Sequence, residues 1–408
     1  MLSGMMISLL FSLLASFCIC IATKEMDPDY GLGTEELILS RGFDYEEYDI
    51  ETEDGYLLKT FRIINPFINE TRMAVLLVHG LVSTSRDFII AGPDGHVKEG
   101  TSKVGSNIGF ELAKRGYDVW LVNNRGNTYS MNHTKYPTNK KINEDSRFWD
   151  FSHGKMAKYD IPATVDFILR ERGDKTLGYI GFSRGSSILL ASLSMYPKLN
   201  SQLRPAIAMA PVTGIRFATP LLVNPITKLL AASTVMLNYP MLQENAIPDD
   251  VKRIVCTIDN GGICAKIFKL FAGDGPDCFD GSRMPVFLSR LPAGTSAKDL
   301  RLFAMEMMGT FAQYDYGPIQ NLKMYGTLKA PEFELEKITN NHIYVMRGGS
   351  DVLSNAIDTE KLIRRLGKNV RQYYIVPFPG WGHAAMIFGK ESGKYVVTPL
   401  LKILDRYD

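Results

Sequence analysis

The chain has 408 residues, of which 46 are Lys or Arg and 44 are Asp or Glu, giving a formal net charge of +2. This length exceeds that of a usual single core, so we expect one large domain that carries an insertion, or two domains. Because positive and negative side chains are mixed along the chain, no basic surface for nucleic acid is predicted, and we expect no nucleic-acid partner.

An apolar run from Met5 to Ala22 opens the chain. Small residues at its last and third-last positions suit signal peptidase, so we predict a cleaved signal peptide over residues 1–22. No Lys or Arg precedes the run and its length could just span a bilayer, which makes an uncleaved anchor the alternative. In a secreted chain, the Asn-x-Thr tripeptides that begin at Asn69 and Asn132 are potential glycosylation sites.

Secretion also predicts which cysteines remain and whether they pair. Cys18 and Cys20 would leave with the signal peptide, and the mature chain would keep Cys256, Cys264 and Cys278. The simplest arrangement is one disulfide and one free thiol. We favour the pair Cys256 and Cys264, because it would close a short loop through an Asn-Gly-Gly turn.

Strands and helices alternate through the first half of the mature chain. A hairpin with an Asp-Gly turn is predicted over Tyr45 to Ile64. The elements that follow are strands at Met73 to Val78, Tyr117 to Val122, Leu177 to Ile180 and Pro205 to Pro211, and helices at Gly105 to Arg115, Met156 to Arg172 and Ser187 to Met195. This alternation predicts an α/β fold with a parallel, doubly wound sheet, whose ligands bind at the carboxyl ends of the strands.

The alternation is lost between residues 214 and 337, where helical stretches and loops dominate. We interpret this segment as a mainly helical cap inserted into a core made of residues 23–213 and 338–408; a second independent helical domain is the alternative. The cap is favoured because alternation resumes with strands at His342 to Met346 and Arg371 to Val376, and helices at Thr359 to Leu366 and Gly393 to Tyr407.

A Gly-x-Ser-x-Gly motif lies where the strand that starts at Leu177 meets the following helix. A serine on such a sharp turn needs small residues two positions to either side, and Gly181 and Gly185 meet that need. In this context the motif predicts that Ser183 is a nucleophile. A packed strand-turn-helix without chemistry is the alternative.

A serine nucleophile needs a histidine to take its proton and an acid to orient that histidine. In α/β hydrolases the chain order is serine, acid, histidine. Asp351 follows a predicted strand, and His383 is the histidine that lies after it at a second strand end. Asp358 is the second choice of acid, although it more plausibly begins a helix. The other histidines are expected to be structural.

The oxyanion formed on attack needs backbone donors, and we expect the amides of Leu81 and Arg184 to supply them. The side chain of Arg184 need play no part, and at the start of a helix its charge is mildly unfavourable. No His, Cys or carboxylate cluster has metal-ligand spacing and no Gly-rich phosphate loop is present, so we expect no metal and no cofactor.

With these residues in place, the chain resembles the acid lipase family, which includes the gastric and lysosomal acid lipases and secreted invertebrate relatives. The similarity runs nearly end to end after residue 22. The segments that carry it are Thr52 to Tyr56, His79 to Leu81, Gly116 to Leu121, Asn124 to Thr128, Met156 to Thr164, Pro292 to Ser296 and Tyr314 to Gly317.

The resemblance implies an α/β-hydrolase fold and hydrolysis of neutral lipid esters, triacylglycerols or cholesteryl esters, through an acyl-serine intermediate. It implies Ser183, Asp351 and His383 as the triad and the disulfide between Cys256 and Cys264. It also implies a lid that meets a droplet, micelle or membrane, for which the apolar run after Pro220 is a candidate, and a secreted or lysosomal location.

Four residues depart from the family pattern. Phe182 and Arg184 stand where the family usually has His and Gln, and Gly382 and Ala385 where it usually has Asn and Asp. Phe182 is expected to pack beneath the elbow, and the lost polar neighbours could loosen the imidazole of His383. A lipid-binding or storage protein that kept the fold and lost the activity is therefore the alternative function.

Overall fold

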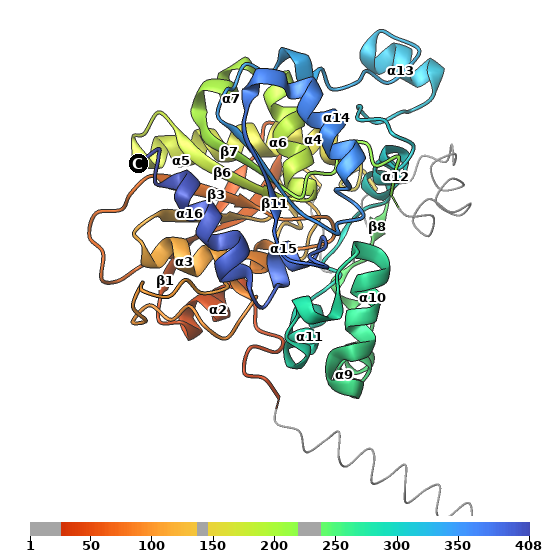
Figure 1. The fold of residues 1–408 in the computed structure, drawn as a ribbon. Coiled ribbons are helices and arrows are strands. Elements are labelled where there is room, and N and C mark those ends of the chain that lie inside the picture. The colour runs from red at the N-terminus through yellow and green to blue at the C-terminus, as the bar shows by residue number, and fades with distance from the viewer. Residues whose placement is uncertain (1–25, 137–145, 219–237) are drawn as a thin grey trace, which may run out of the picture.

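A mostly parallel sheet forms the centre of the computed structural model, which describes residues 26–136, 146–218 and 238–408 (Figure 1). The strands lie in the order β1-β2-β4-β3-β6-β7-β10-β11, and the short β5 pairs with β2. Their bounds are β1 Asp44–Glu51, β2 Tyr56–Ile64, β3 Ala74–Val78, β4 Asp118–Val122, β5 Asn132–His133, β6 Leu177–Phe182, β7 Leu203–Met209, β10 Ile343–Gly348 and β11 Val370–Val376.

The sheet confirms the predicted fold class. β1 and β2 form the expected antiparallel hairpin, and β2 joins β4 and the short β5 antiparallel. Across the sheet from β4 to β11, every pairing is parallel. β3, β4, β6 and β10 are buried along their whole length, as continuous apolar runs in a sheet covered on both faces should be.

Helices cover both faces of the sheet. The helices α2 Thr34–Ser40, α3 Ile108–Lys114, α15 Ala385–Phe388 and α16 Thr398–Leu404 pack into the hydrophobic core on one face. On the other face lie α5 Ile161–Arg172, α6 Arg184–Met195, α7 Pro197–Gln202 and α14 Ala356–Leu366. A single turn α4, His153–Lys155, also precedes α5.

Helix boundaries differ from the sequence-based expectation where glycine or proline interrupts the apolar periodicity. α6 begins at Arg184, directly after the elbow serine, rather than at Ser187. The stretches Met156–Asp160 and Gly393–Val397 are π-helical turns that lead into α5 and α16. Pro162 and Pro399 stand in the first turns of α5 and α16, where a missing N–H leaves no intrahelical bond unmade.

The described part of segment 214–337 is mainly helical, as expected. Its helices are α9 Asp249–Thr257, α10 Gly262–Ala272, α11 Met284–Leu288, α12 Ala297–Glu306 and α13 Pro318–Tyr325, and the two-residue strands β8 Pro240–Met241 and β9 Thr295–Ser296 pair with each other. Figure 1 places α9, α10 and α11 together along one side of the core.

Short 3₁₀ helices occur in the core and in the inserted segment. They lie at Ser85–Ile89, Glu244–Ala246, Ile258–Gly261, Pro276–Cys278, Gly281–Arg283, Leu335–Lys337 and Gly367–Asn369.

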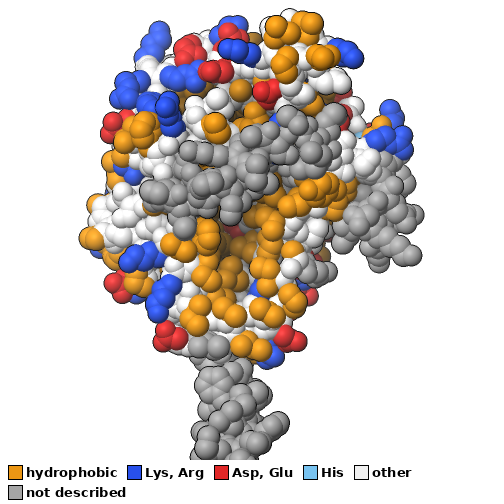
Figure 2. All heavy atoms as spheres, turned by 90° about the vertical axis from the view of Figure 1, so that its right-hand side faces the viewer, with side chains coloured by type: hydrophobic (Ala, Val, Ile, Leu, Met, Phe, Trp, Pro, Cys, Tyr) orange, Lys and Arg blue, Asp and Glu red, His pale blue; other side chains and the backbone are white. Residues whose placement is uncertain are grey.

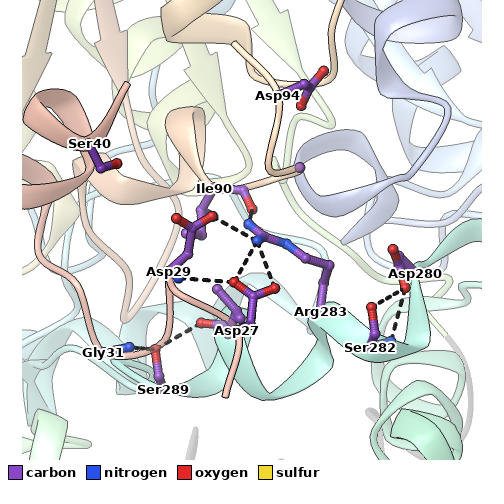
Figure 3. A network of polar contacts seen from close by, with 12 residues as sticks. Asp27, Asp29, Gly31, Ser40, Ile90, Asp94, Asp280, Ser282, Arg283 and Ser289 are labelled. Atoms are coloured by element: carbon purple, nitrogen blue, oxygen red, sulfur yellow. Dashed lines mark hydrogen bonds and ion pairs between the residues drawn. The ribbon is translucent and has the colours of Figure 1, made fainter. Parts of the chain in front are cut away.

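A buried ionic network ties this inserted segment to the start of the described chain (Figure 3). Arg283, just before α11, contacts Asp29 at 2.7 Å and Asp27 at 3.0 Å, and Arg41 donates to the other oxygen of Asp29 at 2.9 Å. Although burial opposes the charge, the two guanidinium groups hold the pKa of Asp29 below its usual value. The network fixes α11 against the core.

Several predictions fall on residues outside the described ranges. The predicted signal peptide lies within residues 1–25, and most of the apolar run after Pro220 lies within residues 219–237. Among the helices that are described, none combines the length and the apolar character needed to cross a bilayer.

Candidate active site

The elbow between β6 and α6 holds Ser183 in a strained backbone conformation, with φ 54° and ψ −112°. A positive φ costs a non-glycine residue free energy, and such strain is concentrated at functional sites. The neighbouring glycines make it possible. A Cβ atom on Gly185 would lie 2.1 Å from the carbonyl oxygen of Val78, and one on Gly181 would lie 2.5 Å from the backbone of Gly185.

The structure brings Ser183, His383 and Asp351 together from three strand ends. Nε2 of His383 lies 2.8 Å from Oγ of Ser183, and Nδ1 lies 2.9 Å from Oδ2 of Asp351. The other oxygen of Asp351 accepts the backbone N–H groups of Leu353 and Ser354, at 2.9 and 2.7 Å. All three side chains are buried. The two distances match the hydrogen bonds of a Ser-His-Asp triad.

The electrostatics suit an imidazole that takes up a proton. Burial disfavours the charged form, but the charge and the hydrogen bond of Asp351 outweigh burial and raise the pKa of His383. Asp358, the second choice of acid, instead lies in the first turn of α14 and accepts the backbone N–H of Phe217 at 3.0 Å. The structure therefore brings Asp351 and not Asp358 to His383.

The two predicted oxyanion donors flank one small cavity, lined by Gly80, Leu81 and Arg184 among others. Arg184 is the first residue of α6, so its N–H has no partner within the helix. His79 holds the end of β3: its Nδ1 lies 2.8 Å from the carbonyl oxygen of Gly80, and Nε2 accepts the N–H of Asn124 at 3.0 Å.

The structure gives His79 a role of its own, whereas the sequence marks it only as part of the strand end at His79 to Leu81. Burial lowers its pKa to about 4, so its neutral imidazole can donate at one nitrogen and accept at the other. The signal available in the sequence was its position before Gly80, at the end of a buried strand.

The side chain of Arg184 has a partner that the sequence does not reveal. It is buried and forms an ion pair with Asp299 of α12. Asp299 also accepts the backbone N–H of His153 at 2.7 Å and the hydroxyl of Thr295 at 2.8 Å. A carboxylate from the inserted segment thus offsets the charge that the helix start disfavours.

Phe182 also lies differently from the expectation. It is buried, but its ring is 5.1 Å from the ring of His383, centroid to centroid, so it packs against the imidazole and not only beneath the elbow. An aromatic ring at this distance contributes packing that limits the movement of His383.

Cys256 and Cys264 form the expected disulfide, which joins the end of α9 to α10. Cys278 is a free, buried thiol, and burial raises its pKa to about 11. Asn69 and Asn132 are exposed, as a glycan would require. Throughout residues 26–136, 146–218 and 238–408, no group of three or more His, Cys, Asp or Glu side chains could hold a metal ion.

Known proteins of similar sequence match nearly the whole of this chain. A family model described as a partial α/β-hydrolase lipase region matches residues 34–92, and one described as the α/β hydrolase fold matches residues 74–221. Mouse lipase member K is 30% identical over 414 residues, covering 96% of this chain and 98% of the mouse protein. Human gastric triacylglycerol lipase is 29% identical over 390 residues and covers 92% of each chain.

Among solved structures, a soluble variant of monoglyceride lipase from Saccharomyces cerevisiae, in complex with a substrate analog, matches with a TM-score of 0.52. The match covers 88% of this chain and 95% of the yeast chain at 14% identity. At that identity the likeness supports the fold.

Proposed function

The chain belongs to the acid lipase family of α/β hydrolases, and from that premise we propose that it hydrolyses neutral lipid esters through an acyl intermediate on Ser183. The observation that carries the proposal is the relay in which His383 lies 2.8 Å from Ser183 and 2.9 Å from Asp351. The strained elbow supports the same role for Ser183, because strain of this kind is costly unless it serves a site.

In the proposed reaction, Nε2 of His383 takes the proton of the Ser183 hydroxyl as Oγ attacks the ester carbonyl. The backbone N–H groups of Leu81 and Arg184 stabilise the oxyanion of the tetrahedral intermediate. His383 then gives its proton to the departing alcohol, and an acyl-serine remains. A water molecule, activated by the same imidazole, releases the fatty acid and restores Ser183.

The surface of the inserted segment supports a lipid substrate. Figure 2 shows apolar side chains gathered on the side of the molecule where α9 and α10 lie in Figure 1. The exposed apolar side chains of these two helices are Val251, Ile254, Ile263, Ile267, Leu270 and Phe271. Contiguous apolar surface of this kind is typical of a site that meets a membrane or a lipid aggregate.

We infer from this surface that residues 214–337 form a cap that meets a droplet, micelle or membrane carrying the ester. Triacylglycerols and cholesteryl esters are the proposed substrates. The named activity of the human gastric relative, triacylglycerol lipase, supports the first of them. No cofactor is needed in the proposed reaction, since the nucleophile, base and oxyanion donors all come from the chain itself.

We further propose that the chain enters the secretory pathway, is cleaved after residue 22 and is glycosylated at Asn69 and Asn132. The exposure of both asparagines supports glycosylation, and the disulfide between Cys256 and Cys264 supports an oxidising compartment. The destination is proposed to be extracellular or lysosomal.

The test compares the mature chain with a Ser183→Ala variant on emulsified triolein and on a short-chain ester. The wild type should release fatty acid from both substrates, and the variant should lose most of this activity, by at least 10³-fold as triad deletions do. Equal rates for the two proteins would refute the enzyme and favour the lipid-binding alternative. A serine-directed phosphonate should label the wild type at Ser183 alone.

A further inference from the structure

The turn that follows α10 lies directly against the loop that carries His383. The backbone N–H of His383 donates to the carbonyl oxygen of Ala272 at 2.9 Å, and the N–H of Gly275 donates to the carbonyl oxygen of Gly380 at 2.8 Å. The turn belongs to the inserted segment, more than a hundred residues before His383. Two backbone bonds therefore clamp the histidine loop onto the insertion.

Asp274 occupies the centre of this turn and is fully buried. Its Oδ2 accepts the N–H of Ala384 at 3.0 Å, and its Oδ1 accepts the N–H of Ala385 at 2.8 Å. Together with the bond to Ala272, the turn satisfies the backbone N–H groups of three consecutive residues, beginning at His383. A carboxylate that accepts amides at both oxygens fixes the backbone more firmly than a neutral acceptor would.

The packing around the turn leaves no room for a Cβ atom at Gly273 or at Gly382. A Cβ atom on Gly382 would lie 2.5 Å from the backbone nitrogen of Asp274, which accounts for glycine at a position where the family usually has Asn. On the opposite side, a Cβ atom on Gly273 would lie 2.2 Å from the carbonyl oxygen of Ser350, the residue before Asp351. The turn is thus wedged between the loops that carry the histidine and the acid.

We propose that Asp274 is a positioning residue that holds the imidazole of His383 in line with Ser183. The inference rests on the proposed function, and it assigns to the inserted segment the support that polar neighbours of the histidine would otherwise give. Ala385 stands where the family usually has Asp, and the carboxylate of Asp274 accepts a hydrogen bond from the N–H of Ala385.

The charge of Asp274 acts in the same direction as its geometry. It adds to the charge of Asp351 in raising the pKa of His383 against the effect of burial. Burial raises the pKa of Asp274 itself to about 7; the two amides act against that rise, the negative charge of Asp351 adds to it, and His383 opposes it. The carboxylate form is therefore most favoured when His383 is protonated, which is the state that the tetrahedral intermediate requires.

The experiment compares Asp274→Ala and Asp274→Asn with Asp29→Ala as a matched control. Asp29 is also buried and also ties the insertion to the core, but it contacts Arg41 and Arg283, not the triad loops. Initial rates are measured on a soluble short-chain ester at a temperature where every variant is folded. For Asp274→Ala we expect kcat to fall roughly 10- to 100-fold with KM within about twofold, because the reacting groups are misplaced and not the binding surface.

Asp274→Asn keeps one oxygen acceptor and should lie between Asp274→Ala and the wild type. Asp29→Ala should keep the wild-type kcat although it lowers the melting temperature. A wild-type kcat in folded Asp274→Ala would overturn the proposal. An equal loss in Asp29→Ala would also overturn it, because the effect would then be one of general stability.

A second measurement does not depend on turnover. The proton on Nδ1 of His383, hydrogen-bonded to Asp351, should give a downfield ¹H NMR resonance in the wild type and in Ser183→Ala. We expect this resonance to broaden or disappear in Asp274→Ala and to persist in Asp29→Ala. A resonance unchanged in Asp274→Ala would refute the positioning role even if the ester assay had already refuted the proposed function.

Discussion

The ion pair between Arg184 and Asp299 offers a quantitative test of how the insertion holds the elbow. Both side chains are almost fully buried, at 3% and 1% exposure. Arg184→Met removes the cation and keeps an apolar stem of similar length. Asp299→Asn removes the anion but keeps an oxygen for the N–H of His153, and its new amide can donate to the hydroxyl of Thr295.

Each single variant leaves one buried charge without its counterion, which typically costs about 3–5 kcal/mol. For a chain of 408 residues the unfolding entropy is about 0.9 kcal/mol/K, so each single variant should lower the melting temperature by about 4–6 °C. The double variant has no uncompensated charge, and replacing a whole buried pair is often close to neutral. We therefore expect a coupling energy of at least about 2 kcal/mol between the two sites.

Thermal unfolding of the wild type, both single variants and the double variant completes the cycle. Assays of the folded proteins on a short-chain ester should also show a larger loss of kcat in the single variants than in the double variant, because the backbone N–H of Arg184 is a proposed oxyanion donor. Additive losses of stability, with the double variant the least stable of the four, would refute the reasoning.

Two further predictions concern the elbow and the pH dependence of stability. Gly185→Ala should cost stability and at least tenfold in kcat, since its Cβ would lie 2.1 Å from the carbonyl oxygen of Val78. The control Gly173→Ala, where no described atom lies within 4 Å, should cost only about 1 kcal/mol for its positive φ. Burial raises the pKa of Asp87 to about 7, so its contribution to stability is present below about pH 4 and is lost as the pH rises to about 7. Asp87→Asn should therefore gain stability relative to the wild type by up to about 4 kcal/mol between pH 4 and pH 8 in denaturant titrations, and an unchanged difference would contradict the buried-carboxyl account.

The strands and the elbow are predictable from the sequence because their signals are local. A continuous apolar run such as Ala74–Val78 is typical of a strand covered on both faces of a sheet. The spacing of Gly181 and Gly185 marks the turn that carries the serine. The order of Ser183, Asp351 and His383 along the chain then predicts a triad. In the structure these three side chains lie at hydrogen-bond distances.

The contacts made by the inserted segment are not predictable in this way. Arg184 and Asp299 are 115 residues apart, and Asp274 and Ala385 are 111 apart. Neither pair has a periodic or spacing signal, because the fold of the insertion alone brings them together. Reasoning from Arg184 by itself therefore predicts an unfavourable charge at a helix start, whereas the structure supplies its counterion.

The insertion is thus part of the machinery that holds the proposed site, and not only its cover. Asp299 holds the elbow residue Arg184, Asp274 holds the histidine loop, and the N–H of Ala293 donates to the carbonyl oxygen of Val82 at 2.7 Å, beside the oxyanion strand. Two residues that depart from the family pattern, Arg184 and Ala385, each contact a carboxylate of this segment. A family residue placed at position 184 alone would therefore leave Asp299 buried without its cation, so these positions should be exchanged only together with their partners.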